Sequence, residues 1–135
     1  SATLKLQELR QQLTPRHLTS NQRQRLVELL KTGPKGTALL TCPMNNSEAS
    51  DFLTEIGAAL KEADWKVAPD IPRIFETTPV GLEFSIPRND TSQPAVESLD
   101  AAFEAVGLTI SNRGVLPGLG TDVRILVGAN PKSIK

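Results

Sequence analysis

The residues best suited to chemistry in this sequence belong to one short turn, Cys42 to Ser47. A thiol, two amides and a hydroxyl, from Cys42, Asn45, Asn46 and Ser47, follow an apolar run and precede a helical pattern. Between a strand and a helix of an α/β protein, such a turn exposes backbone N–H groups that bind anions. These four residues are therefore the candidate ligand-binding site. The competing interpretation, that Asn46 or Ser47 simply caps the helix, is favoured because the turn lacks the glycines of a phosphate-binding loop and Glu48 would repel a phosphate.

Covalent catalysis finds little support in the residue types. Cys42 is the only cysteine and His17 the only histidine, and His17 stands in a linker with nothing to bring it near the thiol. A buried, inert thiol is therefore expected at position 42. The sequence contains no Gly-x-Ser-x-Gly turn, so a serine hydrolase is not expected either. We predict no catalytic residue, no metal ligand and no cofactor.

Two further groups have structural interpretations. Gly114, Gly118 and Gly120 precede a strand, which is the wrong context for phosphate binding, so a connecting loop is expected there. Carboxylates are spaced along helical patterns and are expected on solvated helix faces. They are Glu48 with Asp51, and Glu97 with Asp100 and Glu104.

The turn must be positioned by the elements around it. An apolar run without clean alternation predicts a buried strand over Thr37 to Cys42, near the centre of a sheet, and helical spacing predicts a helix from about Ser47 to Ala63. The rest of the pattern predicts strands at Trp65–Ala68, Val80–Ile86, Leu108–Ile110 and Val123–Val127, a helix from Pro94 to a cap at Gly107, an irregular connection over Pro69–Pro79, and a glycine-rich loop over Ser111–Asp122.

Helical signals also mark the N-terminal part. Leu6, Leu9 and Leu13 form a narrow apolar stripe that suits a coiled-coil seam or packing on the domain. Thr19 and Gln22 have the spacing of a capping box, and Gly33-Pro34 ends the helix that begins there. We predict a helical extension over residues 1–18 and an α/β domain over residues 19–135. The expected fold is a single three-layer domain with a flavodoxin-like or Rossmann-like outline. Its mixed, mostly parallel sheet would have about four or five strands and helices on both faces.

Charge is uneven along a chain whose formal net charge is zero. Residues 1–35 hold seven Lys/Arg and two Asp/Glu, and the remainder holds eight and thirteen. No basic run is interleaved with aromatic residues, so nucleic-acid binding is not expected. The sequence has no apolar run long enough to cross a bilayer. It starts without Met, and we expect a soluble piece of a longer protein.

Three short motifs resemble a known group of proteins. They are RHLTSNQ at residues 16–22, KEADWKV at 61–67 and VGANP at 127–131, with Asp64 where the group has Gly and Asn130 where it has Lys. Together they are similar to the C-terminal soluble domain of small uncharacterised bacterial membrane proteins. In that group a transmembrane pair and a coiled coil precede an α/β domain, and no activity is known.

This resemblance implies that the domain is tethered to a membrane through its N-terminal segment. Residues 1–18 would then be the end of a stalk at the cytoplasmic face of the inner membrane, where an excess of Lys and Arg is favoured. We therefore expect a noncatalytic sensory, scaffolding or protein-interaction domain that self-associates through its N-terminal helix and meets the membrane only through a segment absent from this chain. The alternative is a domain or enzyme that binds nucleotides or phosphorylated metabolites at the Cys42–Ser47 edge.

Overall fold

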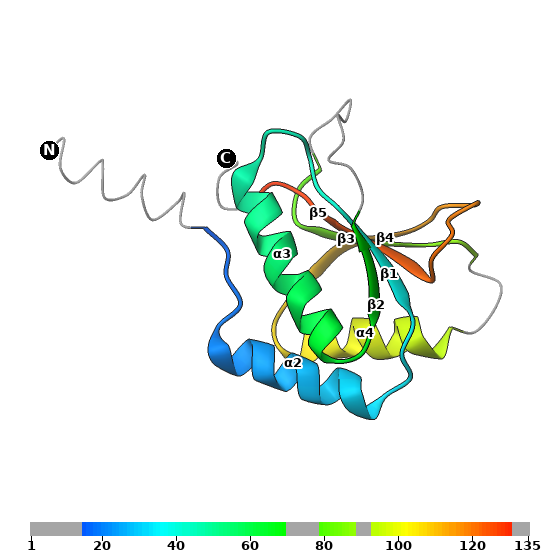
Figure 1. Ribbon diagram of the computed structural model, residues 1–135. Coiled ribbons are helices and arrows are strands. Elements are labelled where there is room, and N and C mark those ends of the chain that lie inside the picture. The colour runs from blue at the N-terminus through cyan, green and yellow to red at the C-terminus, as the bar shows by residue number, and fades with distance from the viewer. Residues whose placement is uncertain (1–14, 70–78, 89–92, 131–135) are drawn as a thin grey trace, which may run out of the picture.

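The sheet has five strands in the order β2-β1-β5-β3-β4. Two helices pack against it, and a third helix packs against those two (Figure 1). The computed structural model describes residues 15–69, 79–88 and 93–130. In chain order the elements are α2 (Ser20–Thr32), β1 (Thr37–Thr41), α3 (Ser47–Glu62), β2 (Lys66–Pro69), β3 (Leu82–Ile86), α4 (Pro94–Ala105), β4 (Ile110–Val115) and β5 (Val123–Val127). The predicted helix around Leu6 to Leu13 lies outside the described residues.

Strand directions confirm a mixed, mostly parallel sheet. β1 is parallel to both β2 and β5, and β3 is parallel to β4. Only the contact between β3 and β5 is antiparallel. The α/β class is thus confirmed. The strand predicted over Thr37–Cys42 near the centre of the sheet is β1, an interior strand between the edge strand β2 and the central strand β5. Strand order depends on which segments meet in space, and no local pattern encodes it.

Both strand–helix–strand units place their helix on one face of the sheet. Leu40, Ile125 and Phe84 form a single cross-strand row, so their side chains point to the same face. α3 reaches this face at Gly57, where a Cβ would lie 2.8 Å from Leu40 Cδ1. α4 reaches it through Phe103, whose ring meets that of Phe84 edge to face.

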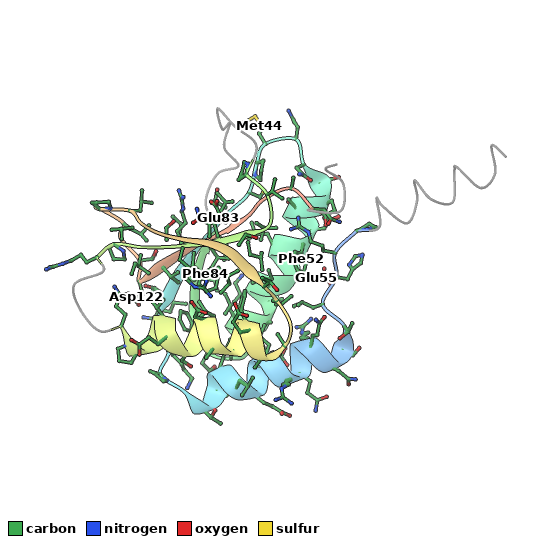
Figure 2. All side chains as sticks on the ribbon, turned by 180° about the vertical axis from the view of Figure 1, so that it is seen from behind. Met44, Phe52, Glu55, Glu83, Phe84 and Asp122 are labelled. Carbon is green, nitrogen blue, oxygen red and sulfur yellow. The ribbon has the colours of Figure 1, made fainter. Side chains whose placement is uncertain are left out.

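The sheet is therefore an outer layer, and not the middle layer that was expected. α2 packs on both α3 and α4, which gives three layers in the order sheet, α3 with α4, and α2 (Figure 1). The expectation of helices on both faces is wrong for the described helices. Figure 2 shows Phe84 between the sheet and α4, and Glu83 on the side of the sheet away from the helices. On that second face Leu39, Arg124 and Ser85 are only partly buried.

Helix ends follow the local signals closely. At α2, Gln22 N donates to Thr19 Oγ1 (3.1 Å) and Thr19 N donates to Gln22 Oε1 (3.0 Å), so the predicted capping box is confirmed. At α4, Pro94 occupies the first turn and Gly107 follows the helix with φ of 83°. A glycine suits this left-handed backbone, and Leu108 N donates to Phe103 O to close the end.

The capping box predicts a measurable loss of stability. Thr19→Ala removes the hydroxyl that accepts from Gln22 N, and should lower the free energy of unfolding by about 1 kcal/mol. Urea denaturation followed by circular dichroism would measure this loss. Ser20→Ala is the matched control, since Ser20 is exposed and lies one residue inside the helix. Equal losses in both variants would contradict the proposed role of Thr19.

The predicted bounds of two strands, β3 and β4, were wrong. β4 runs over Ile110–Val115, so five of the twelve residues of the predicted glycine-rich loop, 111–115, are in a strand. Only Ile110 of this strand is buried, because β4 is an edge strand held by β3 alone in the described sheet. The exposed residues of β4 therefore lack the alternating apolar pattern from which a strand is predicted. β3 begins at Leu82 rather than Val80, because Gly81 has φ of 77° and interrupts it.

Candidate functional site at the strand ends

The candidate turn lies where the carboxyl ends of β1 and β5 meet the N-terminus of α3. β1 and β5 are parallel, so their ends share one edge of the sheet. Asn45 has φ of 62°, a left-handed conformation that Asn tolerates, and it reverses the chain into the helix. Asn46 is the N-cap, and its Oδ1 accepts from Ala49 N at 3.0 Å. Capping by Asn46, as the sequence favoured, is therefore present.

The four candidate residues line one cavity. Its volume is about 360 Å³, and its walls are Cys42, Pro43, Asn45, Asn46, Ser47 and Ser50. Met44 lies at the tip of the turn with 46% of its surface exposed (Figure 2). The structure thus brings together every residue that the sequence indicated as ligand-binding, around an opening bordered by amide and hydroxyl groups. This grouping follows from the shortness of the turn.

The Cys42 thiol is buried, with 3% of the residue exposed. Burial raises the pKa of the thiol, and a hydrogen bond with Ser50 lowers it by less. The ring of His17 instead pairs with Glu55 of α3, at 3.2 Å between Nδ1 and Oε2. In the described part of the chain no histidine therefore activates this thiol, and the site does not resemble a cysteine nucleophile.

The raised pKa predicts slow thiol chemistry. In the folded protein at about pH 8, an aromatic disulfide reagent should react with Cys42 at least about 10-fold more slowly than in the urea-unfolded chain, because little thiolate forms and access is restricted. Absorbance of the released thiol measures the rate, and Cys42 is the only cysteine that can contribute. A folded-state rate equal to the unfolded rate would contradict the buried thiol.

Arg16 is the functional-site residue that sequence reasoning missed. Its Nε and Nη2 donate to Glu48 Oε2 (2.9 Å) and Oε1 (2.7 Å), and its backbone N also donates to Oε2 (2.9 Å). Nη2 also donates to Gly128 O at 2.6 Å, and the guanidinium lies 5.0 Å from the centre of the Phe52 ring. We call this set the Arg16 clasp. No spacing rule could reveal it, because Arg16 and Glu48 are 32 residues apart.

The clasp changes the electrostatics of the turn. Burial alone would raise the pKa of Glu48, but the hydrogen bonds and charge of Arg16, with a smaller contribution from His17, hold that pKa below its usual value. Glu48 therefore stays ionised, and its charge is matched by Arg16. The repulsion that the sequence predicted between Glu48 and a bound anion is weakened by this partner.

A second cavity, of about 580 Å³, lies beside the clasp. Its walls come from segments far apart in the chain: Arg16, His17, Gln22, Phe52, Gly81, Leu82, Gly107, Leu108, Thr109, Ser111 and Asn130. Phe52, Leu82 and Leu108 are buried and form its apolar part. Figure 2 shows Phe52 and Glu55 close together on α3, on the side that faces residues 15–19. Residues of two of the quoted sequence motifs, at 16–22 and at Asn130, thus meet at one place.

Other groups singled out in the sequence lie elsewhere. Gly118 and Gly120 precede β5, at the opposite end of the strand from the turn. At that end Asp122 Oδ2 accepts from Thr37 N at 2.9 Å and ties β5 to β1. Asp100 and Glu104 are not merely solvated, because both bind Arg113 of β4, at 2.6 Å and 3.2 Å.

Within residues 15–69, 79–88 and 93–130, no three His, Cys, Asp or Glu side chains are grouped as a metal site requires. Among the helices that the structure describes, none has the length and apolar character needed to span a bilayer.

Searches of the chain against protein-family models, curated proteins and solved structures give no match.

Proposed function

We propose that this chain is a noncatalytic domain of a membrane-tethered bacterial protein, with a scaffolding or sensory role based on protein interactions. The observation that carries this proposal is the Arg16 clasp. It binds the chain just after the N-terminal segment to the strand-end edge of the sheet, through three hydrogen bonds to Glu48 and one to Gly128 O. A force or a rotation applied to the N-terminal segment would therefore be transmitted through Arg16 to the edge of the sheet that borders both cavities.

The placement of the tether has a direct test. Topology reporters fused to the C-terminus of the full-length parent protein should report a cytoplasmic location, as the basic N-terminal segment favours. A periplasmic C-terminus would contradict the cytoplasmic placement.

Self-association through the N-terminal segment is part of the same proposal. Leu9→Asp with Leu13→Asp places charge in the apolar stripe, and should raise the concentration at which the full chain associates in sedimentation. Gln11→Asp adds charge off the stripe and is the matched control. Equal association in both variants would remove this part of the proposal.

A second candidate function is the binding of a nucleotide or another phosphorylated small molecule at the turn cavity. It is supported by the convergence of Cys42, Asn45, Asn46 and Ser47 on one cavity beside a Glu48 that Arg16 neutralises. A thermal-shift screen with nucleotides and cyclic nucleotides tests it, because a ligand at 100 times its Kd stabilises by about 2.7 kcal/mol. Asn45→Asp is the matched variant, since Asp tolerates the same backbone and repels an anion. No shift in the wild-type protein at millimolar ligand would contradict this function.

A further inference from the structure

In the part of the chain that the structure describes, β4 leaves one long edge of the sheet unpaired. It is an edge strand of six residues, and β3 is its only hydrogen-bonded neighbour in the described sheet. The five residues from Ser111 to Val115 are exposed. Figure 2 shows the golden ribbon of β4 crossing in front of the other strands. A strand in this position presents unpaired backbone groups to any other extended chain.

The hydrogen bonds to β3 identify the outward groups. Leu116 N donates to Ile86 O at 2.7 Å, so the backbone of residue 116 faces β3. Backbone direction alternates along a strand, so Gly114 also faces β3, while the N–H and C=O of Arg113 and Val115 face outward. Two outward donor–acceptor sets therefore lie in the exposed half of β4.

The two edges of the sheet differ in their protection. β2 has four residues, begins with Lys66 and ends with Pro69, which has no N–H to donate. β4 contains no proline. Its one charge, on Arg113, is held by α4 through Asp100 (2.6 Å) and Glu104 (3.2 Å). These contacts, the hydrogen bond to Asp100 first, raise the pKa of Arg113, so the guanidinium keeps its charge, and the two carboxylates of α4 balance that charge.

We propose that β4 is a dimer interface, where it pairs antiparallel with β4 of a second copy of this chain. An isologous contact closes after two copies, whereas pairing of β4 with β2 would build a filament and is opposed by Pro69. The register that sets Arg113 opposite Val115 of the other copy places no like charges opposite each other. It also covers Val115, which is 45% exposed, with the aliphatic stem of Arg113.

In this register the two Gly114 residues face each other across the twofold axis. They form a non-hydrogen-bonded pair, whose Cα atoms lie about 4.5 Å apart in an antiparallel sheet, within the range that a disulfide spans. A Cβ at Gly114 would have no heavy atom within 4 Å, so a side chain fits there. The pairing is thus open to direct cross-linking in the full chain.

Two experiments on the full chain test the interface. With Cys42→Ser as background, Gly114→Cys should give a disulfide-linked dimer under mild oxidation, and Asn112→Cys should not, because in this register the two copies of residue 112 lie about 13 Å apart. Val115→Pro removes an outward N–H and leaves the bonds to β3, and should weaken dimerisation at least about 10-fold in sedimentation, whereas Val115→Thr keeps the N–H and should not.

The outcomes separate this interface from the N-terminal segment. Cross-linking of Gly114→Cys no greater than that of Asn112→Cys overturns the proposal. So does unchanged association of Val115→Pro when it is measured together with Leu9→Asp and Leu13→Asp, which remove association through the N-terminal stripe. Because the Leu9→Asp and Leu13→Asp variant leaves β4 unchanged, either proposal can fail without the other.

Discussion

Phe103→Ala is expected to lower the free energy of unfolding by about 3–5 kcal/mol, the largest effect that we predict for a single substitution. Phe103 is fully buried in α4, and its ring centre lies 5.2 Å from that of Phe84 with 69° between the planes. Removing the ring takes away its contact with Phe84 and leaves a cavity between α4 and the sheet. Urea denaturation followed by fluorescence of Trp65, the only tryptophan, would measure the loss.

Controls separate the size of the ring from its geometry. Phe103→Leu keeps most of the volume and should cost less than half as much as Phe103→Ala. A double-mutant cycle with Phe84→Leu and Phe103→Leu should give a coupling of about 0.5–1.5 kcal/mol, typical of an edge-to-face aromatic pair. A loss below about 1 kcal/mol for Phe103→Ala would show that α4 does not depend on this contact.

Arg16→Ala is expected to lower the free energy of unfolding by about 2 kcal/mol. The substitution removes the side-chain part of the clasp, and leaves Glu48, whose side chain is 22% exposed, without its charged partner. The side chain of Arg16 is 15% exposed. This ion pair is therefore less accessible to water than an ordinary surface ion pair, and its loss should lower the free energy of unfolding by more. Arg16→Lys is the matched control, since it keeps the charge but cannot donate through two nitrogens to Glu48 and also to Gly128 O.

The same variant should change the dependence of stability on pH. Because Arg16 holds the pKa of Glu48 below its usual value, the clasp stabilises fully above the unfolded-state pKa of about 4.3. That stabilisation is lost as the pH falls through the lower folded-state pKa. The difference between wild type and Arg16→Ala should therefore shrink from about pH 7 toward about pH 3. A difference that stays constant over this range would show that Glu48 is not the partner that matters.

Much of the fold follows from local patterns. Three signals were local: the capping box at Thr19, the proline in the first turn of α4, and the apolar stripes of α3 and α4. Each depends on residues only a few positions apart, so the sequence alone reveals it. The candidate turn was visible for the same reason, since Cys42 to Ser47 are neighbours in the chain. The bounds of β4 were not visible, because an edge strand needs hydrogen bonds to one neighbour and no apolar alternation.

The chain's local sequence thus determined its helices, most of its strands, the α/β class and the turn that borders the cavity of about 360 Å³. Only the tertiary structure decided that β5 is central, that α3 and α4 share one face, and that β4 is an edge strand of the described sheet. It also decided that Arg16 meets Glu48 and Gly128. The physical reason is the same in each case. These features depend on which segments, far apart in the chain, come together to bury apolar surface and to pair charges, and the local spacing of residues does not reveal such contacts.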